Sequence, residues 1–253
     1  MIKSKKLSRF KEIEHSFFNS LGGKSKGVYE SLNCGLGSSD NKKAILKNLT
    51  IIKQKIKSGL NKIVLLNQIH SNKFYYIDKT SRLNHKKFTG DALITNKSNT
   101  PIAILTADCA PILLFDKKNK TIAAIHAGWK GAHNGIVKKV IKFMIKKGSS
   151  TKDITAVIGP CISVKNYEVK QDFIKKFIKK DVKTKVFFKK IRNKSYFNLS
   201  KYITHQLKSL NIKRIEVINK DTFDIKNNFF SARRSKSNNE DDYGRNISVI
   251  MIK

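Results

Sequence analysis

Short apolar runs alternate along the chain with lysine-rich segments of helical periodicity, a pattern typical of mixed α/β proteins. Five runs follow one another closely and predict strands at residues 62–68, 91–95, 101–106, 111–115 and 121–126. Because most of the links between these runs are short, we expect largely antiparallel or mixed pairing. Further strands are predicted at residues 154–160, 186–188, 214–218 and 247–252.

The clearest helical pattern lies between residues 135 and 148. Its apolar residues share one helical face, with lysines filling the rest: Ile136, Val137, Val140, Ile141, Met144 and Ile145. We expect this helix to begin near Asn134, to lie across the sheet and to stop at Gly148. Similar patterns predict helices at residues 171–180 and 199–210, whereas the glycine-dense residues 21–40 predict a loop.

The chain has 253 residues, is 40% hydrophobic and contains no linker rich in Pro, Gly or Ser, which predicts a single domain over residues 1–253. No apolar run approaches the roughly 20 residues of a membrane span, and residues 1–15 lack the apolar stretch of a secretory signal. We therefore expect a cytoplasmic protein with no membrane partner. Cys34, Cys109 and Cys161 are too few for a disulfide framework.

A formal net charge of +35 raises the alternative of a basic nucleic-acid-binding protein. Of the 53 basic residues, however, 46 are lysines that spread over almost every polar segment, and only seven are arginines. This spread favours a lysine-rich composition over one dedicated binding stripe, so we expect no specific nucleic-acid partner. A nucleic-acid-binding module would instead show a continuous positive face with aromatic side chains for base stacking.

Three separated residues offer metal-binding side chains: His70, Cys109 and His126. Each lies beside an apolar run, so each is predicted at a strand end. One cysteine and two histidines can bind zinc and leave its fourth position open to water or substrate, as a catalytic site requires. The spacing alone, 39 and 17 residues, is equally consistent with a buried cysteine and two histidines that form only hydrogen bonds.

Nearby residues add candidates for substrate contact. Asp108 adjoins Cys109 and could support a metal ligand. Lys130, just before the predicted helix at Asn134, could accompany free backbone amides that bind a phosphate oxygen. Arg233, Arg234 and Arg245 offer the planar fork that grips phosphate or carboxylate, although they could equally pair with the acidic residues at positions 240–242.

Seven segments in order carry a resemblance to a known family: FFNSLGGKSKGVYESLN, NQIH, GDALIT, TADCAPILL, IHAGWKG, IGPCI with NYEV, and FFSARR with a later GR. Together they span nearly the whole chain. The chain resembles the multi-copper polyphenol oxidase (laccase-like) family, now regarded as purine nucleoside phosphorylases.

The resemblance implies a four-layer α/β/β/α fold with mixed β-sheets and a zinc ion bound by His70, Cys109 and His126; copper can occupy such a donor set in vitro. It also implies phosphorolysis of adenosine, inosine and S-methyl-5′-thioadenosine to a free base and a ribose 1-phosphate, with adenosine deamination as a side activity. The implied partners are purine nucleosides and phosphate.

Within this framework, either Arg233 or Arg234 is predicted to hold the phosphate, Asn33 to contact the ribose or base, and Asp108 to shuttle a proton or act structurally. The chain departs from the family pattern at Lys130, where arginine is usual, so a two-pronged contact there is in doubt. Ala232, Leu49 and Asp221 are further departures, at positions where tyrosine, arginine and cysteine are common.

Two other enzyme classes compete with this interpretation. A laccase requires a histidine-rich trinuclear copper cluster beside a blue-copper site, and six histidines in total are too few for both. A cysteine hydrolase would use Cys109 as the nucleophile and His126 as the base, which requires a metal-free thiolate.

Overall fold

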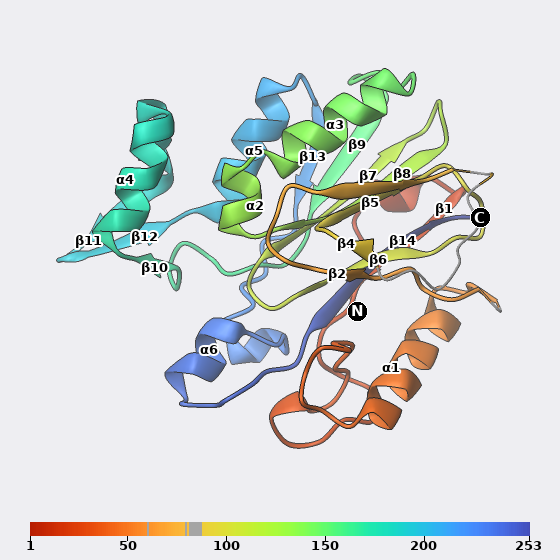
Figure 1. Cartoon of the computed structure of the whole chain (residues 1–253), viewed down its shortest axis with the longest axis horizontal. Helices are drawn as coiled ribbons and strands as arrows, with labels where there is room; N and C mark the ends of the chain where they lie inside the picture. Colours follow the sequence, from red (N-terminus) through yellow and green to blue (C-terminus); the bar gives the residue numbers. More distant parts are fainter. Residues whose placement is uncertain (60, 79, 81–87) are drawn as a thin grey trace.

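The computed structural model describes residues 1–59, 61–78, 80 and 88–253, whose elements form four layers (Figure 1). A six-stranded and a three-stranded sheet pack face to face, and helices cover the outer face of each. The predicted α/β/β/α fold with mixed sheets is confirmed. Within the described ranges, none of the helices combines the length and the apolar character needed to cross a membrane.

The six-stranded sheet has the order β13-β9-β7-β8-β5-β3. The inner pairings β9-β7, β7-β8 and β8-β5 are antiparallel. The outer strand β13 is parallel to β9, and the outer strand β3 is parallel to β5, so the sheet is mixed. Its strands are β3 (Phe74–Ile77), β5 (Ala92–Thr95), β7 (Ala110–Asp116), β8 (Thr121–Ala127), β9 (Ile154–Ile158) and β13 (Arg214–Val217). Every residue of β5, β7, β8 and β9 is buried, as expected for strands covered on both faces.

The three-stranded sheet is antiparallel, with the order β1-β14-β6. Its strands are β1 (Ile13–Phe17), β6 (Ile102–Thr106) and β14 (Asn246–Ile252). Because side chains alternate along a strand, Ile102 and Ile104 face the six-stranded sheet, while Ala103 between them faces the outer helix.

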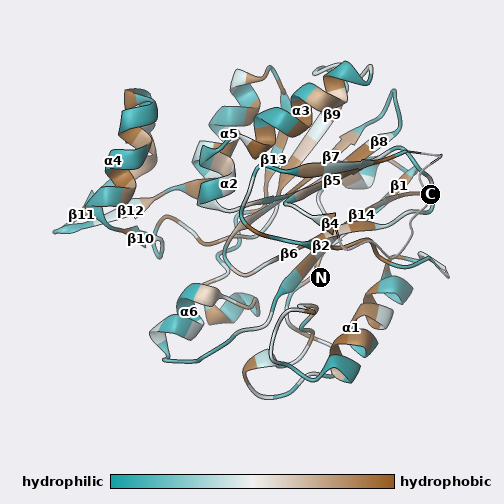
Figure 2. Cartoon of the chain, viewed as in Figure 1, coloured by the Kyte–Doolittle hydropathy of each residue, from teal (hydrophilic) through white to brown (hydrophobic). Residues whose placement is uncertain are grey.

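The outer layers are helical. α3 (Ile136–Lys146) and α5 (Leu199–Ser209) cover the six-stranded sheet, and α1 (Lys42–Lys55) covers the three-stranded one. The apolar stripe of α3 packs on the sheet as predicted, and Figure 2 shows hydrophilic residues along the outer helices. α1 begins where the side chain of Asn41 accepts hydrogen bonds from the amides of Lys43 and Ala44.

Smaller elements surround these layers. β10 (Glu168–Val169), β12 (Lys194–Phe197) and β11 (Phe188–Ile191) form a sheet that projects sideways with α4 (Gln171–Lys180). β2 (Leu66–Asn67) pairs with β4 (Phe88–Thr89), and α2 (Trp129–His133) and α6 (Ala232–Ser237) are short. The 3-10 helices in the described part of the chain are η1 (Leu7–Arg9), η2 (Gly27–Tyr29), η3 (Val182–Phe187) and η4 (Ile225–Asn227).

Three local predictions are corrected. The strand expected at residues 186–188 begins only at Phe188, because Asp181 caps the preceding 3-10 helix through its side chain. The strand expected at 62–68 is confined to Leu66–Asn67 and a single bridge at Val64. The helix expected from Asn134 begins at Ile136 as α3, after Gly135 with a left-handed φ of 82°, and the segment that leads into it forms a short helix of its own, α2.

Candidate active site at the junction of the two sheets

The chain crosses from one sheet to the other at residues 107–109. β6 ends at Thr106 in the three-stranded sheet, and β7 begins at Ala110 in the six-stranded sheet. Asp108, with a φ of 83°, supplies the turn between them. Cys109 is therefore held where the edges of the two sheets meet.

The two predicted histidines reach the same place from other strands. His126 lies near the end of β8, opposite Pro111 of β7, and His70 follows β2. The ligand atoms of His70, Cys109 and His126 all lie within 4.8 Å of one another, and the two imidazole rings meet edge to face at 4.8 Å. His126 is buried, Cys109 half-buried and His70 exposed, so the group opens to solvent on one side.

Asp91, at the start of β5, holds both histidines in place. Its carboxylate is fully buried and accepts four hydrogen bonds: from the amide of His70 (2.9 Å), Nδ1 of His126 (2.8 Å), and the amide (2.5 Å) and hydroxyl (2.7 Å) of Ser71. Burial alone would raise the pKa of Asp91, but the hydrogen bonds from His126 and Ser71 outweigh it and lower this pKa. The bond to Nδ1 leaves Nε2 of His126 as the free ring nitrogen.

Cys109 and His126 shift each other's protonation. Burial alone would raise the pKa of the thiol and lower that of the imidazole. The charge of each partner and the hydrogen bond between them act in the opposite sense, so the pKa of Cys109 is lowered and the pKa of His126 is raised. The thiolate is the form that binds metals and attacks electrophiles.

Gly128 brings backbone against these side chains. A Cβ at this position would lie 2.8 Å from Sγ of Cys109 and 3.0 Å from Cδ2 of His70. The space needed by the two candidate ligands therefore depends on the absence of a side chain here.

Cys109 lies between two cavities, each of about 280 Å³. The first, which we call the Arg233 cavity, is lined by Asp108, Cys109, Ile162, Tyr167, Leu199, Ala232, Arg233 and Lys236. The second, the Tyr243 cavity, adjoins both histidines and is lined by Gly35, Gly37, Leu66, Asn67, Gln68, His70, Leu105, Thr106, Ala107, Cys109, His126, Tyr243 and Arg245. Each cavity thus has cationic and aromatic side chains: Arg233, Lys236 and Tyr167 in the first, and Arg245 and Tyr243 in the second.

The two neighbouring arginines have different surroundings. Arg233 lines the cavity with Cys109, and its guanidinium donates to the carbonyl of Glu168 (3.1 Å) and lies 5.5 Å from the ring centre of Tyr167. The guanidinium of Arg234 instead donates to three loop carbonyls, at residues 222, 223 and 229. The structure places Arg233 at the site and assigns Arg234 to the loop.

Asp108 is buried, and both its carboxylate oxygens have partners. Oδ1 accepts from the hydroxyl of Thr222 (2.6 Å), and Oδ2 accepts from the hydroxyl of Ser231 (2.9 Å) and the amide of Arg233 (2.6 Å). Burial raises the pKa of Asp108 despite these hydrogen bonds. The carboxylate therefore anchors the beginning of α6 and with it the backbone of Arg233; proton transfer by Asp108 stays a prediction.

The remaining predicted substrate residues lie apart from the cavities. Asn33 is fully buried, and its amide bonds Ser38, Asp40, Gly35 and Arg245. It shapes the loop that brings two of these residues, Gly35 and Arg245, to the Tyr243 cavity, and its own contact with a substrate stays a prediction.

Lys130 is exposed at the start of α2, 5.7 Å from the ring centre of Trp129, and lines neither cavity. A phosphate contact from Lys130 stays a prediction.

Sequence reasoning missed several residues of the site. Gln68 exchanges two hydrogen bonds of 2.7 Å with the backbone of Leu105, which joins the His70 segment to β6. Tyr243 was also missed, and its ring centre lies 4.3 Å from the guanidinium of Arg245. Arg245 itself pairs with Asp242, one of the acidic partners considered for it from the sequence. The signals lay in GDALIT, NQIH and DDYGR, in which Asp91, Gln68 and Tyr243 were not singled out as residues of the site.

The other histidines form no second metal cluster in the part of the chain that the structure describes. His15 accepts a hydrogen bond from the amide of Ser4, and His133 and His205 pack against phenylalanine rings. His85 lies outside the described residues. No counterpart of a trinuclear copper cluster is found among the residues described.

The fold and the site define a class of protein: a four-layer α/β/β/α architecture that holds two histidines and a cysteine where its two sheets meet. The family model of the multi-copper polyphenol oxidoreductase laccases matches residues 14–253, and the chain belongs to this family.

Curated relatives support an enzyme at the level of the family. A Rickettsia conorii protein named purine nucleoside phosphorylase is 37% identical over 194 residues, covering 76% of this chain and 78% of the relative. A Bacteroides thetaiotaomicron protein of the same name is 32% identical over 263 residues, covering 100% and 96%. The crystal structure of a hypothetical Bacillus licheniformis protein is 27% identical with a TM-score of 0.87, covering 95% of this chain and 93% of that one.

Proposed function

We propose that this protein is a zinc-dependent purine nucleoside phosphorylase acting on adenosine, inosine and S-methyl-5′-thioadenosine. One observation carries the proposal: Cys109 lines two cavities. One contains the cations Arg233 and Lys236, and the other contains the aromatic ring of Tyr243. A reaction between phosphate and a purine nucleoside needs such a pair of adjoining spaces. The names of the relatives support the same chemistry.

The three candidate ligands fit a zinc ion. Adjacent ligand atoms around tetrahedral zinc lie about 3.5 Å apart, since Zn–N is about 2.0 Å and Zn–S about 2.3 Å. The observed separations, all within 4.8 Å, exceed this by no more than about 1.3 Å, which side-chain rotation can close. Asp91 on Nδ1 of His126 is the partner that a zinc-binding histidine needs.

The residues of the chain account for the reaction as follows. Arg233 and Lys236 hold phosphate by charge-assisted hydrogen bonds, and Tyr243 packs against the nucleoside. A phosphate oxygen forms a bond to C1′, the bond from C1′ to the purine nitrogen breaks, and its electron pair leaves with the base, which takes up one proton. Zinc, when bound, supplies Lewis-acid chemistry at the boundary of the two spaces.

Deamination of adenosine is proposed as a side activity of the same site. Water replaces the exocyclic amino group, ammonia leaves, and a group that moves protons is required. Asp108 is a candidate for this role because burial raises the pKa of its carboxyl and because the next residue, Cys109, lines the cavity proposed for the nucleoside.

A specific observation also favours a second candidate, a cysteine hydrolase. Asp91 orients His126, which in turn faces a thiol of lowered pKa, and this is the arrangement of a nucleophile, base and orienting carboxylate. Iodoacetamide distinguishes the two candidates. A zinc-bound thiolate is alkylated only after chelation, whereas a free nucleophile reacts at once and the purified protein holds no stoichiometric zinc.

Product analysis tests the proposed function. The protein is incubated with adenosine, with and without phosphate, and the products are separated by chromatography. Adenine and ribose 1-phosphate are expected only when phosphate is present. A smaller amount of inosine is expected even when phosphate is absent. Cys109→Ala should abolish the phosphate-dependent product, and an absence of product from all three nucleosides would refute the proposal.

A further inference from the structure

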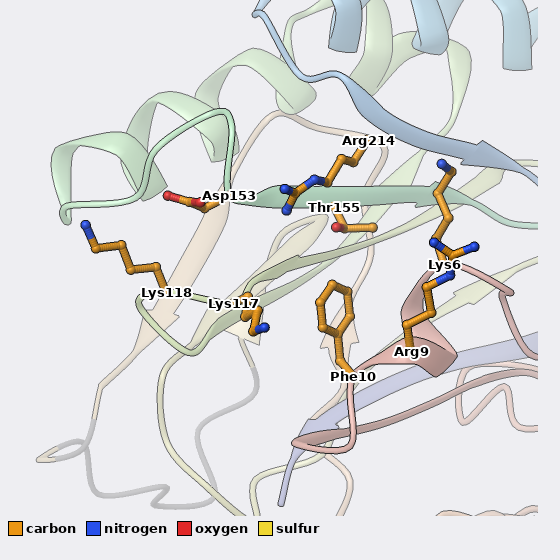
Figure 3. A pocket seen from close by; sticks show the side chains of 8 residues that line it. All are labelled: Lys6, Arg9, Phe10, Lys117, Lys118, Asp153, Thr155 and Arg214. Carbon is orange, nitrogen blue, oxygen red and sulfur yellow. The ribbon is translucent and has the colours of Figure 1, made fainter.

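A second, larger cleft of about 790 Å³ lies far from Cys109 (Figure 3). It is lined by Lys6, Arg9, Phe10, Lys117, Lys118, Asp153, Thr155 and Arg214. Cys109 precedes the first residue of β7, whereas Lys117 and Lys118 follow the last. Seven residues of strand separate them, a length of about 20 Å. The cleft is therefore distinct from the candidate active site.

The lining of this cleft is strongly basic. Five side chains are cationic and one, Asp153, is acidic. Across the described ranges, none of the five cations forms an ion pair. Charges of one sign that line a concave surface repel one another and raise the local concentration of anions.

The cleft is built on fixed backbone. Glu216 of β13 accepts hydrogen bonds from the hydroxyl of Ser4 (2.7 Å) and the amides of Lys5 (3.1 Å) and Lys6 (2.7 Å). These bonds fasten the amino-terminal segment to the edge of the six-stranded sheet. Figure 3 shows Lys6 and Arg9 side by side at one end of the cleft, with the guanidinium of Arg214 directed away from them toward Thr155 and Asp153.

Two buried polar atoms of the lining lack hydrogen-bond partners among the described residues. Thr155 is only 1% exposed, and neither its hydroxyl nor Oδ2 of Asp153 has a hydrogen-bond partner in the structure. Both are atoms whose burial without a partner costs about 1 to 3 kcal/mol. In the view of Figure 3 the guanidinium of Arg214 lies between Thr155 and Asp153. An anionic ligand that pairs with Arg214 would therefore lie near both of these polar atoms.

From these features we propose that the cleft binds a phosphorylated small molecule of nucleotide size. Phosphate groups would pair with the basic side chains, and ligand hydroxyl or amino groups with Thr155 and Asp153. Phe10, whose ring meets Phe115 edge to face at 5.0 Å, offers a surface for a base. The volume lies within the usual range for small-molecule sites and is far larger than a single phosphate requires.

Calorimetric titration of the full chain with ADP tests this proposal. Arg214→Gln should weaken ADP binding by about tenfold or more, because it removes a charged hydrogen-bond donor. Arg192→Gln is the matched control. It removes the same charge from an exposed position in the turn between β11 and β12. Thr155→Val should weaken binding by about fivefold without lowering the Tm, because it removes only a hydroxyl. Cys109→Ala should bind ADP as the unmodified chain does.

Each other result overturns the proposal. Equal losses of ADP affinity in Arg214→Gln and Arg192→Gln would mean that ADP is attracted only by the general positive charge of the surface. Unchanged ADP affinity in Thr155→Val would mean that ADP does not contact Thr155 in this cleft. If Cys109→Ala loses ADP binding and the cleft variants do not, ADP binds at the candidate active site and not in the cleft. If a single-stranded DNA decamer binds through Arg214 while ADP does not bind, the cleft is a nucleic-acid surface. The expected pattern would stand even if phosphorolysis were refuted, because it does not depend on the first site.

Discussion

Gly128→Ala is predicted to inactivate the site while leaving the fold in place. The backbone at Gly128 has φ −70° and ψ 166°, which any residue adopts, so alanine introduces no backbone strain. The new methyl group would lie 2.8 Å from Sγ of Cys109 and 3.0 Å from Cδ2 of His70. The destabilising part of the effect must therefore come from this contact.

The magnitude follows from the overlap. Ordinary contacts between such atoms are about 3.5 to 4.0 Å, so the sulfur must move by about 1 Å. Overpacking of this kind costs about 1 to 3 kcal/mol, and replacing glycine at a compatible backbone position returns about 0.4 to 1 kcal/mol. We expect a net loss of about 1 to 2 kcal/mol in the free energy of unfolding. A displacement of 1 Å at a reacting centre lowers the rate about 100-fold.

Three measurements assay this variant. Urea denaturation gives the free energy of unfolding, elemental analysis gives zinc per chain, and chromatography gives the rate of adenosine phosphorolysis. We expect a large loss of zinc and of rate beside a small loss of stability.

A double-mutant cycle with Cys109→Ala isolates the contact. In that background the sulfur is absent, so Gly128→Ala should cost about 1 kcal/mol less than in the unmodified chain. If the cost is the same in both backgrounds, or if zinc content and rate do not change, the reasoning from the Cβ position is wrong.

Three further predictions concern buried and half-buried polar groups. Asp91→Asn should lower zinc affinity about 10- to 100-fold, measured by competition with a chelator, because it disrupts the partner of Nδ1 of His126. Arg233→Gln should raise the KM for phosphate about tenfold, whereas Arg234→Gln should mainly lower stability by about 3 kcal/mol in urea denaturation, through the loss of bonds to three carbonyls. Burial lowers the pKa of His15 to about 4, against about 6.5 when unfolded, so the unfolded chain protonates first and stability should fall by about 3 kcal/mol from pH 7 to pH 4. His15→Gln, which can still accept from Ser4, should remove that part of the pH dependence in denaturation at the two pH values; an unchanged slope would contradict it.

Hydrophobic periodicity predicted the parts of the fold that are held by apolar packing alone. β7, β8 and β9 are continuous apolar runs that are buried on both faces, and the stripe of α3 matches the sheet beneath it. β1 was missed because its buried residues include His15 and Ser16, which become interior only through hydrogen bonding and sheet packing.

α1 was missed for a related reason. Its fully buried Asn48 bonds four groups of the glycine-rich loop, through Lys24, Ser25, Ser31 and Asn33. A polar residue with this role breaks the apolar stripe by which a helix is detected, since its partners are known only once the loop is folded against it.

The candidate site divides in the same way. Residue type and motif order were enough to propose His70, Cys109 and His126 as a group. The distinction between Arg233 and Arg234 was beyond the sequence, because neighbours on a helix point about 100° apart and only the surrounding chain decides which one meets a cavity. The role of Asp91 likewise depends on register, which sets it beside His126 across the β5-β8 pair.

Two buried carboxylates determine where the site forms in a chain with 53 basic and 18 acidic residues. A charge moved into the interior is costly unless hydrogen bonds satisfy it, and Asp91 with four such bonds and Asp108 with three meet that condition. Asp91 ties both histidines to β5, and Asp108 ties Arg233 to the crossing between the sheets. The groups proposed to bind zinc and phosphate are thus fixed by partners that cannot leave without exposing an unpaired charge to the interior. The surplus lysines carry no such constraint, because water and salt screen charges at the surface.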